Sequence, residues 1–271
     1  MLKDLPLQTI VNLSLKAGDE VMKVYAKDFE VAYKSDHSPL TEADTLANEI
    51  ICGGLESLFP DLPILSEETK AASFETRQKW DYYWCIDPID GTKEFIKKNG
   101  QFTINIALIH KETPILGVVY APALKVLFAA KKGEGAYRQN LGPIQPSAKI
   151  PLPLHVKESM VVVASKSHRS KQTQTFIDTL SQTYPNLQIG SMGSSLKLCM
   201  VAEGSANIYP RMAPTMEWDT AAAHAIVLEC GKGVYMYDPN LEPLDYINGH
   251  PKLKSIVYNK TNLLNPDFVV V

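Results

Sequence analysis

Apolar residues recur every three or four positions in two stretches of the first sixty residues, which predicts two amphipathic helices. The first helix covers residues 5–27. The second begins near Thr41, where Thr41-Glu42-Ala43-Asp44 fits the start signal of a capping box and an apolar face follows. Short apolar runs separated by turn residues then predict strands. We expect these strands at residues 64–65, 82–86, 103–109, 115–120 and 126–130.

The second half of the chain alternates predicted strands and predicted helices. We expect strands at residues 160–164, 187–191, 206–209, 234–237 and 255–258. We expect helices at residues 170–184, 194–202 and 217–229. Such alternation favours layered α/β packing. Four prolines fall between residues 141 and 153, so we place a boundary there and divide the chain into an N-terminal lobe, 1–145, and a C-terminal lobe, 146–271.

The composition is that of an ordinary folded protein of 271 residues, with 45% hydrophobic and 21% charged residues. These values exclude a disordered chain, a collagen-like chain and a coiled coil. The net charge of -3 provides no broad positive field for a nucleic acid polymer or an anionic membrane. An anionic ligand must therefore be bound by local groups, namely backbone amides, a few basic side chains or metal ions.

Cysteine spacing and hydropathy indicate where the protein resides. The four cysteines form no CxxC pair and are too few for a disulfide scaffold, so we expect free thiols in a reducing compartment. No apolar run approaches the roughly 18 residues that a membrane-spanning helix needs. The first residues also lack the continuous apolar segment of a signal peptide. We expect a cytoplasmic protein with no integral membrane segment; loose attachment to the inner face of a membrane and the oligomeric state stay open.

Candidate chemistry concentrates in the segment Asp87-Pro88-Ile89-Asp90-Gly91-Thr92, which follows a predicted strand. Proline and glycine favour a turn that can bring the carboxylates of Asp87 and Asp90 toward one point. Two crowded carboxylates repel each other unless one is protonated or a cation lies between them, and hard oxygen ligands suit Mg²⁺. The amides of Gly91 and Thr92 would then bind phosphate at the start of a short helix. An Asx-turn followed by a helix cap is the structural alternative.

Three further acidic positions carry the same ambiguity between structure and function. Glu67 lies in Ser66-Glu67-Glu68 at a strand end, where it is either a metal ligand or part of a solvated loop. Asp219 precedes an alanine-rich helix, where it is either an N-cap or a metal ligand, with small residues allowing close packing behind it. Asp44 either completes a capping box or orients a water molecule.

Three of these segments, in the expected order, resemble the inositol monophosphatase superfamily of Mg²⁺-dependent, lithium-sensitive phosphatases. They are SEE at 66–68, DPIDGTKEF at 87–95 and WDTAA at 218–222. Finer motifs are similar to one branch, the 3′(2′),5′-bisphosphate nucleotidases of the CysQ type. They are SKSH at 165–168, GSSLK at 193–197, AEG at 202–204, YPR at 209–211 ahead of Pro214-Thr215, and PLDY at 243–246. Ala213 and Ala223 depart from that branch, where we would expect glycine; this bears on local packing more than on chemistry.

The resemblance implies a fold and a metal site. The fold is an α/β (α+β) sandwich of alternating layers, αβαβα, whose N-terminal lobe carries the metal site and whose C-terminal lobe covers it and selects the substrate. Two or three Mg²⁺ ions are expected, with inhibition by Li⁺ and by Ca²⁺. The implied metal ligands are Glu67, Asp87, the carbonyl of Ile89, Asp90 and Asp219. The groups implied to position the attacking water are Asp44, Glu67 and Thr92.

The branch motifs imply a small-molecule nucleotide substrate, 3′-phosphoadenosine 5′-phosphate, which is hydrolysed to AMP and phosphate. The sulfated form, 3′-phosphoadenosine 5′-phosphosulfate, is a second expected substrate. The phosphate to be cleaved would lie among Glu67, Ile89, Asp90, Gly91, Thr92 and Asp219. The 5′-phosphate and adenosine would lie against Ser194 at a helix start, Lys197 on the same helical face, Arg211 at a strand end and His168 after another strand. The alternatives are a solvated lysine, a structural arginine and a loop histidine.

Two other functions stay open from the sequence. Inositol monophosphate or fructose 1,6-bisphosphate would undergo the same chemistry, and the metal motifs cannot separate these substrates from a nucleotide. A non-catalytic sensor of Mg²⁺ and nucleotide is a rival of another class. Such a sensor would be indicated by loss of Glu67, Asp90, Thr92 or Asp219, and all four are present.

Overall fold

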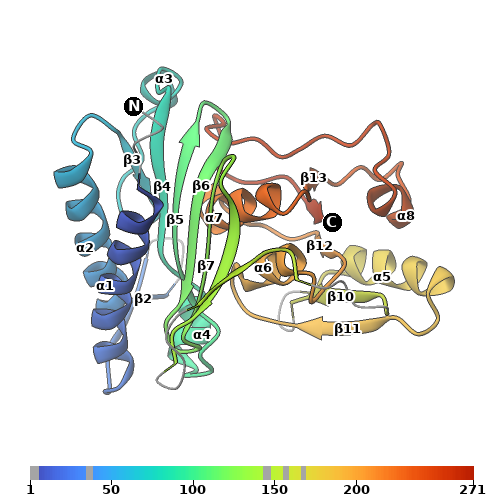
Figure 1. The fold of residues 1–271 in the computed structure, drawn as a ribbon, viewed down its shortest axis with the longest axis horizontal. Coiled ribbons are helices and arrows are strands. Elements are labelled where there is room, and N and C mark those ends of the chain that lie inside the picture. Colours follow the sequence, from blue (N-terminus) through green and yellow to red (C-terminus); the bar gives the residue numbers. More distant parts are fainter. Residues whose placement is uncertain (1–5, 35–38, 143–147, 155–158, 166–168) are drawn as a thin grey trace.

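The computed structural model describes residues 6–34, 39–142, 148–154, 159–165 and 169–271 (Figure 1). The helices are α1 (Leu7–Tyr25), α2 (Glu42–Leu58), α3 (Phe74–Arg77), α4 (Thr92–Ile96), α5 (Lys171–Thr183), α6 (Leu196–Glu203), α7 (Glu217–Glu229) and α8 (Pro243–Ile247). The strands of the first half are β1 (Val31–Tyr33), β2 (Pro39–Thr41), β3 (Ile64–Ser66), β4 (Tyr82–Asp90), β5 (Thr103–His110), β6 (Thr113–Ala121), β7 (Val126–Lys131), β8 (Gly135–Asn140) and β9 (Lys149–Pro151). Those of the second half are β10 (Val161–Ala164), β11 (Gln188–Ser191), β12 (Tyr209–Arg211), β13 (Val234–Met236) and β14 (Phe268–Val270).

A seven-stranded sheet in the order β3-β4-β5-β6-β7-β8-β9 forms the centre of the molecule. Only its first pair, β3 and β4, is parallel, and the other pairs are antiparallel. Because successive side chains of a strand point to opposite faces, the central strands bury apolar residues on both sides. Trp84 and Ile86 of β4 belong to the core under α1 and α2, whereas Tyr83 and Cys85 belong to the core under α6 and α7.

Five layers follow one another across the molecule in Figure 1. Helices α1 and α2 cover one face of the seven-stranded sheet, and α6 and α7 cover the other. Beyond α6 and α7 lie the two small sheets, β10-β11 and β12-β14-β13, and then α5 and α8. Strand β10 shows the same alternation: Val161 and Val163 pack toward α6, while Val162 and Ala164 pack with α5 and α8. The predicted αβαβα sandwich is confirmed.

The alanine-rich helix α7 lies unusually close to the central sheet. A Cβ atom added at Gly117 of β6 would lie 2.0 Å from the carbonyl oxygen of Ala222 in α7. Only glycine on the strand and a small residue on the helix allow this approach. The closeness of α7 to the sheet sets the position of Asp219, which lies in its first turn.

Most predicted elements of the second half are present, but three differ from expectation. Helix α6 begins at Leu196 with Ser195 as its N-cap, so Ser194, with a φ of 45°, lies outside the helix that we expected it to start. The strand expected at 206–209 is observed as β12, Tyr209–Arg211. Residues 255–258 form no strand, because the amide of Ile256 donates to Val234 while that of Tyr258 donates to Glu112. Val234 belongs to β13, whereas Glu112 lies in the turn between β5 and β6, so no continuous ladder of hydrogen bonds forms.

Several elements had no prediction, and these are short or polar: β1, β2, β8, β9, β14, α3 and α8. The proposed lobe boundary falls in the connection between β8 and β9, two neighbouring strands of the seven-stranded sheet, and residues 143–147 of this connection lie outside the described residues. The division into lobes 1–145 and 146–271 stays a prediction. No helix of the described ranges has the length and apolar character needed to cross a membrane.

Candidate functional site

Asp87 is a deeply buried acidic group at the centre of the site. It continues the alternation of Tyr83 and Cys85 along β4, so its side chain points to the face of the sheet that α6 and α7 cover. The residue is 1% exposed, and neither carboxylate oxygen has a hydrogen-bond donor within the described part of the chain. Burial, followed by the nearby carboxylates of Glu67, Asp90 and Asp219, raises the pKa of Asp87 well above its usual range.

Glu67 and Asp219 converge on Asp87 from two other elements. Glu67 directly follows β3, which runs parallel to β4, and its amide donates to the carbonyl oxygen of Ile86 at 3.2 Å. Parallel strands present their carboxyl ends at one edge, so Glu67 and Asp87 lie close together. One carboxylate oxygen from each of Glu67, Asp87 and Asp219 lies within 4.8 Å of the other two.

Asp219 lies in the first turn of α7, at N3, rather than at the N-cap expected as its structural alternative. One of its oxygens, Oδ2, accepts a hydrogen bond from the amide of Met216 at 2.8 Å, which completes a capping interaction. Burial, together with the neighbouring Asp90, raises the pKa of Asp219 to about 8. The residue thus caps the helix and also contributes a carboxylate oxygen to the acidic cluster.

The turn after Asp87 is irregular, as its proline and glycine predict. The pairing register between β4 and β5 shifts between Asp87 and Asp90, and Gly91 follows with a φ of 91° in the left-handed region. Helix α4 then begins at Thr92. Burial raises the pKa of Asp90, although Lys197 and Ser195 oppose this shift.

Asp44 completes a capping box, one of the two roles that the sequence left open, and also contacts Thr92. Its Oδ2 accepts from the amide of Thr41 at 2.8 Å, which completes the capping box of α2. Its Oδ1 accepts from the hydroxyl of Thr92 at 3.2 Å. The same hydroxyl lies 3.3 Å from the carbonyl oxygen of Ile89. Asp44 therefore connects the start of α2 to the turn that carries the predicted phosphate-binding amides.

The residues present fit a divalent cation. A pocket of about 350 Å³ is lined by Glu67, Asp87, Ile89, Asp90, Gly91, Thr92 and Asp219, among others. Buried carboxylates that lack donors and repel one another are costly unless they are protonated or share a cation. Hard carboxylate and carbonyl oxygens are the ligands that Mg²⁺ takes. The strongest indication of a cation is that both carboxylate oxygens of Asp87 are buried without a hydrogen-bond donor among the described residues.

A second pocket of about 300 Å³ adjoins the acidic cluster and shares Asp90, Gly91 and Asp219 with the first. Ser194, Lys197 and Arg211 line it, so three of the four residues expected to bind the 5′-phosphate are brought together. The fourth, His168, lies outside the described residues, as do Lys166 and Ser167 of the same motif. The pocket therefore places cationic side chains beside the acidic cluster.

Lys197 and Arg211 are held by the backbone of that pocket. The Lys197 ammonium donates to the carbonyl oxygen of Ser194 at 2.6 Å, and burial lowers the pKa of Lys197 to about 8 against the opposing effect of Asp90. The guanidinium of Arg211 donates to the carbonyl oxygens of Ala213 at 3.2 Å and Pro214 at 3.0 Å. Ala213, which departs from the branch pattern, thus contributes to the site through its carbonyl group.

Sequence reasoning missed two groups that contact these acidic residues. Lys34 donates to Glu67 at 2.8 Å and to Glu68 at 2.6 Å, which joins the segment after β1 to the metal-site loop. Ser195 donates to Asp90 at 2.8 Å. Both contacts join residues more than thirty positions apart, so no local pattern indicates them.

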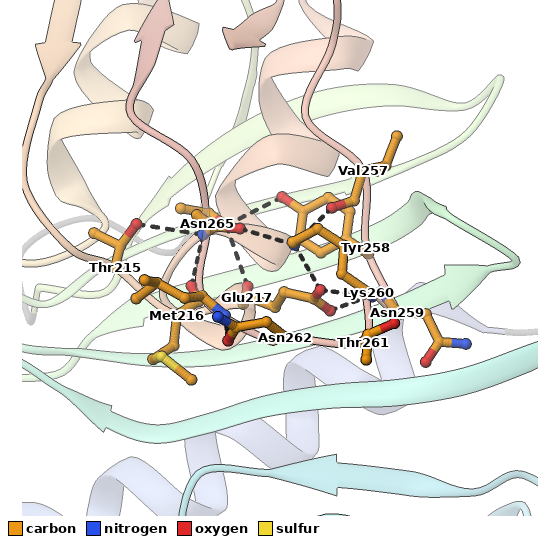
Figure 2. A network of polar contacts seen from close by, with 12 residues as sticks. Thr215, Met216, Glu217, Val257, Tyr258, Asn259, Lys260, Thr261, Asn262 and Asn265 are labelled. Carbon is orange, nitrogen blue, oxygen red and sulfur yellow. Dashed lines mark hydrogen bonds and ion pairs between the residues drawn. The ribbon is translucent and has the colours of Figure 1, made fainter. Parts of the chain in front are cut away.

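A buried polar network also holds the start of α7 (Figure 2). Glu217, the first residue of α7, is fully buried and accepts from the ammonium of Lys260 at 2.6 Å. The amides of Asn259 and Lys260 also donate to Glu217, at 2.7 Å and 3.0 Å. The side-chain amide of Asn265 donates to the carbonyl oxygen of Met216 at 2.8 Å. The segment 257–265 therefore clamps the turn that carries Asp219.

Comparisons with known proteins show the family to which the chain belongs. The sequence pattern of the inositol monophosphatase family matches residues 5–267. The 3′(2′),5′-bisphosphate nucleotidase CysQ of Salmonella typhimurium is 45% identical over 244 residues, which cover 89% of this chain and 93% of that protein. The enzyme of the same name from Escherichia coli K12 is 43% identical with the same coverage. The crystal structure of CysQ from Bacteroides thetaiotaomicron, 40% identical, superposes with a TM-score of 0.82 and covers 97% of this chain and 96% of that one. The chain belongs to the inositol monophosphatase family.

Proposed function

We propose that this protein is a Mg²⁺-dependent phosphomonoesterase that removes the 3′-phosphate of 3′-phosphoadenosine 5′-phosphate. The products are AMP and inorganic phosphate. The observation that carries the proposal is the junction of two pockets. One holds the clustered carboxylates of Glu67, Asp87 and Asp219, and the other holds the cations Lys197 and Arg211. The similarity to bisphosphate nucleotidases over 89% of the chain supports the choice of substrate.

The acidic cluster would hold the cations, with Glu67, Asp87, Asp90, Asp219 and the carbonyl of Ile89 as ligands. Bound Mg²⁺ ions supply two effects there: a lowered pKa for the attacking water and compensation of the charge on the phosphoryl group. Their number, two or three, belongs to the proposal, as does inhibition by Li⁺ and Ca²⁺.

The chain's own groups orient the water and the phosphoryl group. Thr92 donates its only hydroxyl proton to Asp44, so its oxygen is left to accept a hydrogen bond from the attacking water. Asp44, which accepts from Thr92, and Glu67 would take up the proton that this water loses. The amides of Gly91 and Thr92 would donate to the phosphoryl oxygens. The new bond joins the water oxygen to phosphorus and the bond from phosphorus to the ribose 3′-oxygen breaks. That oxygen takes up a proton from solvent water, which balances the proton that the attacking water loses.

Substrate selection belongs to the second pocket in this proposal. Lys197 and Arg211 would bind the 5′-phosphate, together with Ser194 and His168, and the adenosine would extend along the remaining wall. The sulfated nucleotide carries the same 3′-phosphate, so it is a second proposed substrate. The cytoplasmic location stays a prediction.

A panel of phosphomonoesters tests the proposal. Phosphate release is measured with Mg²⁺ from 3′-phosphoadenosine 5′-phosphate, inositol 1-phosphate and fructose 1,6-bisphosphate. We expect the nucleotide to have the highest kcat/KM, and Asp90→Asn to lower its turnover on the order of a hundredfold or more at almost unchanged side-chain volume. A preference for inositol 1-phosphate would refute the nucleotide assignment, and near-normal turnover by Asp90→Asn would refute the metal assignment.

A further inference from the structure

Ser195 occupies the N-cap position of α6, but its hydroxyl does not cap that helix. Serine is favoured at this position because its oxygen usually accepts a hydrogen bond from an amide of the first turn. Here the side chain makes no such bond, and its backbone has helical angles, with φ −63° and ψ −10°. A capping role therefore does not explain the residue.

The hydroxyl instead joins three elements of the site. Its oxygen lies 2.8 Å from Oδ2 of Asp90, at the end of β4, and 2.7 Å from the carbonyl oxygen of Asp219, in α7. The side-chain amide of Asn105, in β5, donates to the same oxygen at 2.8 Å. Ser195 and Asn105 are each 1% exposed. A hydroxyl has one proton and two lone pairs, so Ser195 accepts from Asn105 and shares its single proton between the Asp90 carboxylate and the Asp219 carbonyl oxygen.

The sheet register explains why Asn105 is available. Asn105 pairs directly with Asp87 across β4 and β5, and the two side chains share the face that α6 and α7 cover. Apolar neighbours of the same face, Cys85 and Ala107, belong to the core beneath those helices. A buried amide among apolar residues is costly unless it is hydrogen-bonded. Its bond to Ser195 fixes the direction in which the hydroxyl proton points, namely toward Asp90 and Asp219.

We propose that Ser195 is a positioning residue of the metal centre, oriented by Asn105. It holds the carboxylate of Asp90 and the backbone of Asp219 at a fixed separation, although the two residues lie 129 positions apart in the chain (219 − 90). Ser195 acts through these residues, because neither pocket that holds the proposed cation and nucleotide is lined by its side chain. The proposal rests on the metal site of the proposed function but not on the identity of the substrate.

Metal binding in the absence of substrate tests this role. Binding of Mn²⁺ and of Mg²⁺ to the full chain is measured by titration calorimetry for the wild type and for Ser195→Ala. We expect the dissociation constant of Ser195→Ala to rise about 10- to 100-fold, the usual effect of removing a hydrogen-bond partner of a metal ligand. At saturating Mg²⁺ the KM for the nucleotide should stay near the wild-type value, while the Mg²⁺ concentration for half-maximal rate rises.

A matched control separates positioning from stability. Ser14→Ala removes a fully buried hydroxyl in α1 that donates to the carbonyl oxygen of Val11 at 2.8 Å. Helix α1 lies on the opposite face of the central sheet from α6 and α7, so this hydroxyl is far from the acidic cluster. It should leave the metal dissociation constant unchanged within about twofold, since independent sites do not couple. Ser195→Thr, which retains the hydroxyl, should recover most of the affinity lost in Ser195→Ala.

Asn105→Ala is the second variant, and it stays informative should Ser195→Ala fail to fold. It should weaken metal binding in the same direction, and the double variant should lose no more than Ser195→Ala alone, because both changes remove one connected set of bonds. Wild-type metal affinity in Ser195→Ala or in Asn105→Ala would overturn the proposal, as would an equal loss in Ser14→Ala. Failure of the wild type to hydrolyse the nucleotide, with these metal-binding results intact, would overturn the substrate assignment and leave the role of Ser195 standing.

Discussion

Lys260→Met removes the ammonium group that pairs with Glu217, and we expect it to lower the free energy of unfolding strongly. The Glu217 carboxylate is fully buried at the first residue of α7, whereas the Lys260 side chain is 23% exposed. In Lys260→Met the carboxylate keeps the two amide donors from Asn259 and Lys260 but loses its only ion-pair partner among the described residues.

The expected loss of free energy of unfolding depends on how far the two amide donors compensate the unpaired carboxylate. Breaking a buried ion pair by deleting one member costs about 3–5 kcal/mol, because the other charge stays buried. Two amide donors and the partly exposed lysine place the expected loss near the lower limit, at about 3 kcal/mol. Adding Glu217→Gln should restore part of it, since a neutral carboxamide needs no counter-charge, and the coupling in a double-mutant cycle should be about 1–3 kcal/mol.

Lys131→Met supplies the control. The ammonium of Lys131 lies 2.6 Å from Oε1 of Glu134, the same distance as in the Lys260 pair, but the Glu134 side chain is 56% exposed. Exposed pairs contribute about 0–1 kcal/mol. Urea unfolding followed by far-UV circular dichroism gives the free energies of unfolding. A loss below about 1 kcal/mol in Lys260→Met, or equal losses in both lysine variants, would refute the argument that burial sets the cost.

Three further outcomes are expected. Gly117→Ala should lower the free energy of unfolding by about 1–3 kcal/mol or more, because its Cβ would lie 2.0 Å from the Ala222 oxygen. Gly53→Ala is the control: a Cβ atom at this helical site would meet no atom within 4 Å, so the change should not destabilise the protein. Lys197→Met and Arg211→Met should each raise the KM for 3′-phosphoadenosine 5′-phosphate about ten- to a hundredfold but leave that for 3′-AMP nearly unchanged; equal losses on both would contradict the 5′-phosphate assignment. Li⁺ should inhibit Mg²⁺-dependent phosphate release, as should excess Ca²⁺ with its longer, looser coordination, and indifference to both would contradict the metal site.

The parts of the site that local sequence patterns predicted are those whose geometry is local. The turn from Asp87 to Thr92 contains its own proline and glycine, and the register shift and left-handed Gly91 appear where these residues require them. Strand alternation then determines the face to which Asp87 points. The sequence could not assign Asp44 to one role, because its two oxygens have different partners: one completes the helix cap and the other accepts from Thr92. Its role toward the attacking water stays a prediction.

The parts that could not be predicted depend on partners distant in sequence. Ser195 lies 90 positions from Asn105, and Glu217 lies 43 positions from Lys260. A serine at a helix start is ordinarily an N-cap, and a lysine in a loop is ordinarily a solvated charge. Their residue types therefore did not indicate the roles that these two residues have in the structure. The segment 255–258 was predicted as a strand for the same reason. Its apolar residues fit a strand, but its amides are divided between β13 and the turn after β5.

The site is assembled across layers that are packed before any ligand arrives. Glu67, Asp87 and Asp90 come from one edge of the central sheet, and Asp219 comes from α7, whose distance from that sheet is set by the contact of Gly117 with Ala222. Ser195 joins Asp90 to α7 from one side, and the Glu217–Lys260 pair holds the first turn of α7 from the other. Four mutually repelling carboxylates cannot hold themselves together, so the apolar layers and these two polar clamps must supply the constraint. Lys197 lies on α6 and Arg211 on β12, and neither forms part of the two clamps, so under the proposed function substrate preference can change there without moving the acidic cluster.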